Sequence, residues 1–566
     1  MQRDDSDIGQ NPLPGWFAFA SLILLSTLAI SSCTCNGTPA TDPGPDGESN
    51  GDSVAEGQHP PESVPKTGRE LYLHHCAACH GDNGDGKGLA ARFIFPKPRD
   101  FRAGKFRLVS TKNNVPSAEN LDAVLVRGMP GSSMPPWNHL SADQRKLLVE
   151  EVMRLRREGA SEQYVAVLKN EEGLTDDEIA DPDVQDEIKE FADSRSTPGE
   201  TSEVPTIGEP SAEAIARGKE IYIKQSCHSC HGEDGKGGGT KEQIDDEGYP
   251  TRPRDYTRGI FKGGHDPASL YRRIAYGMPG TPMPSSTNLT SEQTTDLVHF
   301  LRSMSDEKTR EAAVLKRKQL IVRQVGETPA SPGSEAWSDV EPLGLQMVPL
   351  WWRDDGDPGL QVQAVHDGKT IAFRLSWQDD TADRHAAKSE AFEDGVALEL
   401  YRGDAEPFFG MGAKGAPIDM WFWDADRQGD QVAMNDLYPN APVNAYTYSA
   451  TGEVADEVSH DGAGAAGNPI VPTDTASGGS SLTAGGPGTL TFRLPKNQSV
   501  QAHGEWGDGR WSVVMTRELV VDAESDGLSL DPGSENSIAF AVWDGSQRDR
   551  DGKKLITIWH NLKLEQ

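Results

Sequence analysis

Residues 73–88, "LHHCAACHGDNGDGKG", place two cysteines three positions apart and a histidine directly behind the second. The pattern recurs at residues 225–239 as "QSCHSCHGEDGKGGG". Two later phrases recur in the same order: "KPRDFRAGKF" (97–106) matches "RPRDYTRGIF" (252–261), and "GMPGSSMPPWNHLS" (128–141) matches "GMPGTPMPSSTNLT" (277–290). Shared phrases at nearly equal spacing indicate two copies of one domain.

A C-x-x-C pair alone has several meanings, among them a redox dithiol and half of a zinc site. The histidine behind it decides, because in C-x-x-C-H the two thiols attach a haem to the chain and the imidazole binds its iron. A zinc site would need further cysteines or histidines at ligand spacing, and none lies nearby. The sequence therefore predicts two covalent c haems, one on Cys76, Cys79 and His80 and the other on Cys227, Cys230 and His231.

The phrase G-M-P-G-x-x-M-P gives each repeat two methionines. A thioether opposite the histidine raises the reduction potential of the iron, which suits electron transfer. The repeats resemble class I cytochromes c, and this resemblance implies that the second methionine of the phrase binds iron, Met134 in the first repeat and Met283 in the second. Met129 and Met278 are then expected to pack beside the haem edge.

Other charged or titratable residues flank the motifs. Arg99 and Arg254, in the repeated "PRD" phrase, are suited to pair with haem propionates, or alternatively with the neighbouring Asp100 and Asp255. Three histidines adjoin the cysteines and are expected to face solvent instead of binding iron, namely His74, His75 and His228.

Helical periodicity predicts that each repeat is a small all-α domain. "SADQRKLLVEEVMRLRR" (141–157) opens with Ser141 as a helix N-cap and carries apolar residues at helical spacing. "TSEQTTDLVHFLRSM" (290–304) repeats the design, with Thr290 or Ser291 as the cap.

The N-terminal region predicts export. "WFAFASLILLSTLAI" (16–30) is uncharged, has the length of a signal-peptide core and is shorter than the ~20 residues needed to span a bilayer. It leads into "ISSC", which resembles the lipobox of bacterial lipoproteins and implies that Cys33 is lipidated. An uncleaved helical anchor and a cleaved, secreted protein are the alternatives, and all three place the body outside the cytoplasm. The sequence leaves the state of Cys35 open.

Beyond residue 334 the pattern changes to strands. "LQVQAVHDGKTIAFRLSW" (360–377) alternates on both sides of Asp367-Gly368, a strong hairpin signal. Ten of the twelve tryptophans lie in this region. An all-β sandwich is predicted, with further strands in "VALELYR", "DMWFWDA", "TLTFRLP", "WSVVMTREL", "SIAFAVWDG" and "LITIWHNLKL".

This region resembles a known haem subunit. "EAFEDGVALELYRGDAEPFFGMGAKGAPIDMWFWDADR" (390–427) and "AFAVWDGSQRDRDGKKLITIWHNLKL" (539–564) look like the haem b-binding gamma subunit of ethylbenzene dehydrogenase. Its relatives are the corresponding subunits of the dimethyl sulfoxide reductase family, including nitrite oxidoreductases. The resemblance implies one b haem between a methionine and a lysine, which fall on Met411 and Lys554, with Lys553 as a close competitor. An insertion at about 426–488 departs from a compact sandwich.

Charge and length bound the remaining possibilities. The 566 residues carry 55 Lys+Arg against 88 Asp+Glu, and the formal charge of −33 would repel nucleic acid. The expected order is a leader at 1–33, a flexible tether at 34–65, cytochrome c domains at 66–157 and 211–308 with an acidic linker at 158–210 between them, a linker at 309–334 and the sandwich at 335–566.

These features predict an exported, membrane-anchored electron-transfer protein on the periplasmic side and not an enzyme. By resemblance, its partner is a molybdenum-dependent oxidoreductase with iron–sulfur subunits, and a further acceptor lies downstream. Two other interpretations are a peroxidase-like di-haem enzyme, in which Met134 or Met283 leaves the iron open, and a di-haem cytochrome whose sandwich binds protein, or carbohydrate through Trp421 and Trp423.

Overall fold

The computed structural model describes residues 66–353, 358–384, 390–403, 405–408, 410–428, 478–522 and 527–566. The predicted leader and tether, with Cys33 and Cys35, and most of the predicted insertion lie outside these residues. In the described part of the chain, no helix is long and apolar enough to cross a membrane.

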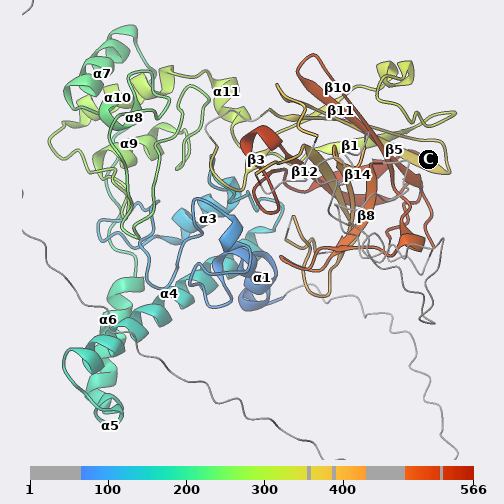
Figure 1. The fold of residues 1–566 in the computed structure, drawn as a ribbon. Helices are drawn as coiled ribbons and strands as arrows, with labels where there is room; N and C mark the ends of the chain where they lie inside the picture. The colour runs from blue at the N-terminus through green and yellow to red at the C-terminus, as the bar shows by residue number, and fades with distance from the viewer. Residues whose placement is uncertain are drawn as a thin grey trace, which may run out of the picture. The chain divides into compact units, whose positions relative to one another are not determined.

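The first repeat is helical, as predicted. Its core is made by apolar side chains such as Leu71, Tyr72 and Leu148. The Ser141 hydroxyl accepts the N–H of Gln144 at 3.2 Å, and the Gln144 side chain accepts the N–H of Ser141 at 2.9 Å. This capping box fixes the predicted helix start. The elements are α1 (Gly68–His75), α2 (Ala77–His80), η1 (Ala91–Phe93), α3 (Ala118–Arg127) and α4 (Ala142–Asn170) (Figure 1).

The second repeat has the same helical plan. Thr290, and not Ser291, is the N-cap of its last helix, because the Thr290 hydroxyl accepts the N–H of Gln293 at 3.2 Å. In both repeats a buried tyrosine closes the turn behind the motif: Tyr72 donates to the carbonyl of Gly81 at 2.8 Å and Tyr222 to that of Gly232 at 2.7 Å. The helices are α7 (Ala212–Lys224), α8 (His228–His231), α9 (Pro267–Ala275) and α10 (Ser291–Ser303).

The acidic stretch between the repeats has more structure than its composition indicated. Helix α4 continues to Asn170, and α6 (Pro182–Ser196) packs against it after the short α5 (Asp176–Ile179). Leu168 and Ile188 meet in a small buried cluster. A few apolar residues are enough to hold α6 in place, because the long helix α4 already provides the surface against which it packs. A short helix, α11 (Glu307–Ala312), follows the second repeat.

The C-terminal region is built from strands that join into one 14-stranded sheet. The predicted hairpin at Asp367-Gly368 is confirmed, because it joins β4 (Leu360–His366) to β5 (Thr370–Gln378) in antiparallel register. The other strands are β1 (Gln319–Gln324), β2 (Leu343–Leu345), β3 (Val348–Pro349), β6 (Gly395–Tyr401), β7 (Ile418–Asp424), β8 (Gly479–Ala484), β9 (Thr491–Phe492), β10 (Gln501–Gly507), β11 (Arg510–Glu518), β12 (Glu535–Trp543), β13 (Leu555–Ile556) and β14 (His560–Leu564).

The sheet is mixed, which the expectation of an all-β sandwich did not include. Its order is β10-β11-β5-β4-β1-β14-β12-β6-β7-β8-β9, and β1 pairs in parallel with β14 through its first residues and with β4 through its last two. Side chains from strands on either side of β1 in this order, such as Phe373 on β5 and Trp421 on β7, share one core. The two halves of the sheet therefore pack face to face, so the sandwich is formed by one sheet that folds over itself.

Buried tryptophans and one ion-pair cluster fill the space between the halves. Trp421 and Trp423 are both 0% exposed, so neither can bind carbohydrate at the surface as one interpretation required. Asp419 lies in the same interior and accepts from Arg493 at 2.6 Å and from Arg517 at 2.5 Å. These two guanidinium groups balance a carboxylate that would otherwise be costly to bury.

His560 on β14 predicts a pH dependence of stability. Burial, with the nearby charges of Arg317 and Lys318, lowers its pKa to about 3, against an ordinary value of 6.5. Between these values the unfolded chain binds a proton that the folded chain does not, so stability falls as the pH is lowered from about 6.5 to about 3. We expect His560→Gln to reduce the slope of unfolding free energy against pH by about 1.4 kcal/mol per pH unit over this range.

Urea titrations at several pH values, followed by circular dichroism, measure this slope. The matched control is His503→Gln, because the His503 side chain is half exposed. An unchanged slope in His560→Gln would show that this imidazole already takes up its proton in the folded chain.

Candidate functional site

The residues of the first motif line one pocket in the first repeat. Cys76, Cys79 and His80 lie on its wall together with Met129 and Met134, and the cavity measures about 170 Å³. Neither cysteine forms a disulfide within the described residues. The sequence therefore folds so that two thiols, an imidazole and two thioethers meet at one mainly apolar cavity.

His80 is oriented for metal binding. Its Nδ1–H donates to the carbonyl of Arg99 at 2.9 Å, and its ring stacks on Phe101 with centroids 4.4 Å apart. Burial lowers its pKa to about 4, so the ring is neutral at physiological pH. A backbone carbonyl that fixes the Nδ1–H tautomer leaves Nε2 as the acceptor, which is the usual arrangement of a ligating histidine.

The methionine loop of the first repeat depends on glycine. Gly128 has a φ of +70°, and a Cβ at this position would lie 2.7 Å from the carbonyl oxygen of Met134. The N–H of Met129 donates to that same oxygen at 3.0 Å. The tight turn thus brings both methionines to the cavity wall, so placement alone does not choose between them.

The second repeat forms a corresponding pocket of about 420 Å³. His231 stacks on Tyr256 with centroids 5.2 Å apart, and burial lowers its pKa to about 4. Its Nδ1 has no hydrogen-bond partner among the described residues, which distinguishes it from His80. The predicted ligand residues on this wall are Cys227, Cys230, His231 and Met283, joined by Met278.

A third pocket, of about 460 Å³, lies on the outer face of the folded sheet. Met411 and Lys554 both line it, together with apolar side chains such as Phe422 and Trp543. Its volume is within the ~300–1,000 Å³ typical of ligand sites. Residues that are 143 positions apart in the chain thus meet at one cavity, as the family resemblance implied.

The two competing lysines lie in different environments. The Lys554 ammonium is 4.6 Å from the ring centroid of Trp543, its residue is 7% exposed, and burial lowers its pKa to about 8. Lys553 is absent from the pocket wall, donates to the carbonyl of Arg548 at 3.3 Å and lies 3.8 Å from a carboxylate oxygen of Asp549. Only a neutral amine binds iron, so the environment of Lys554 is the better suited.

Glu399 on β6 is a site residue that the sequence analysis missed. It is 5% exposed, one carboxylate oxygen accepts the N–H of Gly410 at 2.7 Å, and the other has no partner among the described residues. Burial raises its pKa to about 7, against the attraction of Lys554. Glu399 therefore holds the turn that precedes Met411 and lies close enough to Lys554 for their charges to interact. A single acid in the apolar strand "VALELY" was the available signal.

One expectation for the residues that flank the motifs was wrong, and one of the two alternatives for the arginines is not observed. His75 is 5% exposed and lines the first pocket, so the expectation that it faces solvent was wrong. Arg99 pairs with Glu247 of the second repeat, and Arg254 donates to the carbonyl of Pro130 in the first repeat at 3.2 Å. Neither arginine forms an ion pair with the neighbouring aspartate in the described residues, because contacts between the repeats replace it.

Neighbouring pockets share residues. Ile94 and Phe408 line both the pocket of the first repeat, called the first cytochrome pocket below, and the pocket that contains Met411 and Lys554, called the sheet pocket below. Arg254 and Lys262 line both cytochrome pockets. The first pocket therefore borders each of the other two.

Comparison with known proteins identifies the domains. A family model described as ethylbenzene dehydrogenase matches residues 334–555, one described as cytochrome c matches 215–305, and one described as cytochrome C oxidase, cbb3-type, subunit III matches 63–150. The chain thus combines two cytochrome c domains with a C-terminal domain of the ethylbenzene dehydrogenase family. Both resemblances predicted from the sequence are confirmed, and these are domains of haem-containing electron-transfer proteins.

Three relatives match about two fifths of the chain. The protein ORF7 of Haloferax mediterranei, named as a respiratory nitrate reductase heme subunit, is 28% identical over 41% of this chain and 68% of its own length. The dimethylsulfide dehydrogenase subunit gamma of Rhodovulum sulfidophilum is 27% identical over 41% and 73%. The chlorate reductase subunit gamma of Ideonella dechloratans is 28% identical over 36% and 64%.

Proposed function

We propose that this chain is the multihaem electron-transfer subunit, or redox partner, of a molybdenum-dependent oxidoreductase. Two c haems would be held by Cys76, Cys79, His80 and Met134 and by Cys227, Cys230, His231 and Met283, and one b haem by Met411 and Lys554. The haems supply the redox change, while the chain supplies ligands, orientation and a low-dielectric surrounding. The named roles of the relatives as heme or gamma subunits support such a partner.

The observation that carries this proposal is the shared walls of the three pockets. Electron transfer requires cofactors with close edges, and Ile94 and Phe408 separate the sheet pocket from the first cytochrome pocket. Arg254 and Lys262 similarly stand between the two cytochrome pockets. This arrangement supports a relay in which electrons pass between the b haem and the second c haem by way of the haem in the first cytochrome domain.

Haem content provides the first test. We expect a pyridine haemochrome assay with acid–acetone extraction to give two covalent c haems and one extractable b haem per chain. Lys554→Leu and Met411→Leu should each lose the extractable haem and keep both covalent ones, because each removes one iron ligand at similar volume. Lys553→Leu is the matched control and should keep all three. Loss of b haem in Lys553→Leu alone would assign the ligand to that residue instead.

The order of the relay provides a second test. Met134→His should lower the potential of the first c haem, because imidazole replaces the thioether. We expect electron transfer between the b haem and the second c haem to slow by roughly tenfold or more, since each ~1.4 kcal/mol of added barrier costs a factor of ten. Pulse reduction followed at the separate b and c absorption bands measures the rate.

Met283→His is the control for this order. It should lower the potential of the second c haem only and leave transfer from the b haem to the first c haem unchanged. A Met134→His variant with lowered potential but an unchanged rate to the second haem would contradict the middle position.

Export and anchoring belong to the same proposal. The apolar run ending in Cys33 supports a lipidated N-terminus on the periplasmic side. We expect the wild-type chain in the membrane fraction and Cys33→Ser in the soluble periplasmic fraction or retained as precursor, with Cys35→Ser as the matched control. A Cys33→Ser variant that is processed and stays in the membrane fraction like wild type would exclude lipidation at this residue.

A further inference from the structure

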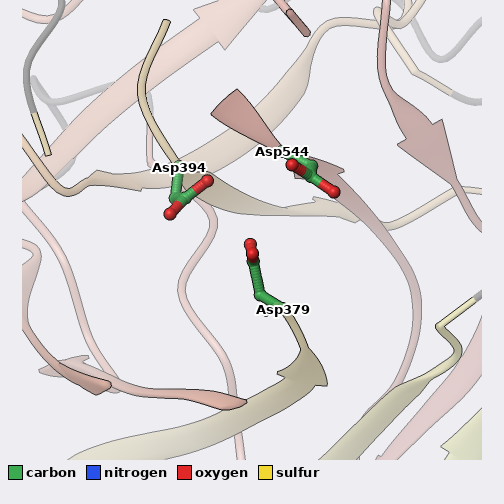
Figure 2. Close-up of side chains that lie close together, drawn as sticks. All are labelled: Asp379, Asp394 and Asp544. Atoms are coloured by element: carbon green, nitrogen blue, oxygen red, sulfur yellow. The ribbon is translucent and has the colours of Figure 1, made fainter. Parts of the chain in front are cut away.

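Three aspartates that do not line any of the three pockets converge at one end of the folded sheet. Asp379 directly follows β5, Asp394 directly precedes β6 and Asp544 directly follows β12. One carboxylate oxygen from each lies within 4.8 Å of the other two. Figure 2 shows the Asp379 carboxyl pointing toward the space between the other two side chains. Asp379 is 5% exposed, Asp394 is 0% exposed and the Asp544 side chain is 16% exposed.

Asp394 is held rigidly by donors from three segments. Its Oδ1 accepts the N–H of Gly545 at 2.8 Å, and its Oδ2 accepts the N–H of Asp383 at 2.7 Å and the indole N–H of Trp511 at 2.9 Å. A carboxylate has about four acceptor positions. Three are therefore occupied, and the remaining one is available to a ligand.

Asp379 is the least satisfied of the three. Asp544 Oδ1 accepts from the Ser546 hydroxyl at 2.7 Å and from the N–H of Gln547 at 3.2 Å. Asp544 forms an ion pair with Arg353 at 3.0 Å, and Arg353 also binds Asp549 at 2.8 Å. Asp379 Oδ1 accepts the N–H of Thr381 at 3.1 Å and its hydroxyl at 3.4 Å. Its Oδ2 is buried and has no partner at hydrogen-bond geometry in the described residues, although the Trp377 side chain lies near enough to lower the pKa of this carboxyl against the larger effect of burial. The cluster thus aims an unpaired oxygen of a buried side chain at two further carboxylates.

The local charge is unbalanced. Burial, together with repulsion from Asp394 and Asp544, raises the pKa of Asp379 to about 8, and burial raises the pKa of Asp394 to about 6. Two arginines compensate the buried Asp419. Among the ion pairs of the described residues, Arg353 pairs with Asp544 and Asp549, while neither Asp379 nor Asp394 takes part in one. Buried carboxylates persist when they are protonated, paired or bound to a metal.

We propose that Asp379, Asp394 and Asp544 bind a calcium ion. Calcium takes oxygen ligands at ~2.3–2.6 Å, so three carboxylate oxygens that lie within 4.8 Å of one another can share one calcium ion. Magnesium usually keeps several of its waters and binds through one or two carboxylates, so a buried site of three carboxylates suits calcium better. Backbone carbonyls and water complete the six to eight ligands that calcium takes.

The ion would connect the two halves of the folded sheet. Asp379 belongs to the half that contains β5, while Asp394 and Asp544 belong to the half that contains β6 and β12. Gly395 and Trp543, the direct neighbours of these two, line the sheet pocket. Calcium therefore stabilises the fold at the point where two strands of the pocket wall begin and end.

The test uses the full chain after treatment with EGTA. We expect isothermal titration to show one calcium ion per chain with a dissociation constant that Mg²⁺ cannot match. Added Ca²⁺ should raise the melting temperature by several degrees, and Asp379→Asn should weaken calcium binding roughly tenfold or more and remove the rise. Haem content is measured in parallel and should be unchanged in EGTA-treated wild type, so failure of the haem assignments would be recognised separately.

Asp380→Asn is the matched control, because this neighbouring aspartate is exposed and should bind calcium like the wild type. Two results would overturn the site. One is the absence of any calcium effect, with Asp379→Asn as stable as the wild type, which would mean that the cluster holds a proton instead. The other is calcium binding of equal strength in Asp379→Asn and wild type, which would place the ion elsewhere.

Discussion

The first cytochrome domain packs one short segment, residues 90–95, onto the outer face of strands β6, β7 and β12, and the arrangement of the pockets depends on this contact. Ala90 and Ile94 belong to the same apolar cluster as Met420 of the sheet. Phe95 donates its N–H to the carbonyl of Leu350 at 2.8 Å. The N–H of Ala90 also donates to the carbonyl of Ala78, inside the first C-x-x-C-H motif, at 2.8 Å. One segment therefore touches both the motif and the sheet, which is why two pockets share a wall.

Buried charged side chains are compensated in different ways at three places in the sheet domain, namely Asp419, Lys554 and Asp379. Asp419 is compensated by two arginines. Lys554 sits where desolvation favours its neutral form, with Glu399 as its nearby acid, and this suits a residue proposed to bind iron. The cluster around Asp379 has neither full pairing nor a neutral partner. Because an unpaired buried carboxylate is costly, this difference is why a cation is proposed at Asp379 and not at Asp419.

Local sequence signals predicted local structure well. The repeat, the capped helix at Ser141 and the hairpin at Asp367-Gly368 each depend on residues close together in the chain, so their patterns can be read directly. Relations between distant segments could not be read in this way. The pairing of Arg99 with Glu247 follows from packing of one repeat against the other. The approach of Glu399 to Lys554 and to the turn before Met411 depends on pairing between distant strands of the sheet domain. The expected surface role of Trp421 failed because strand alternation does not tell which face of a strand is interior.

The two faces of β7 explain why the pocket lined by Met411 and Lys554 lies outside the sandwich. Trp421 and Trp423 fill the interior and leave no room there, while Met420 and Phe422, which alternate with them, point to the outer cluster. An apolar outer face exposed to water would be a liability unless something covers it. The first cytochrome domain covers part of this face, and the pocket lined by Met411 and Lys554 occupies the neighbouring part. The same apolar surface therefore docks the cytochrome domain and forms the pocket lined by Met411 and Lys554, so domain packing alone is enough to bring the two pockets together.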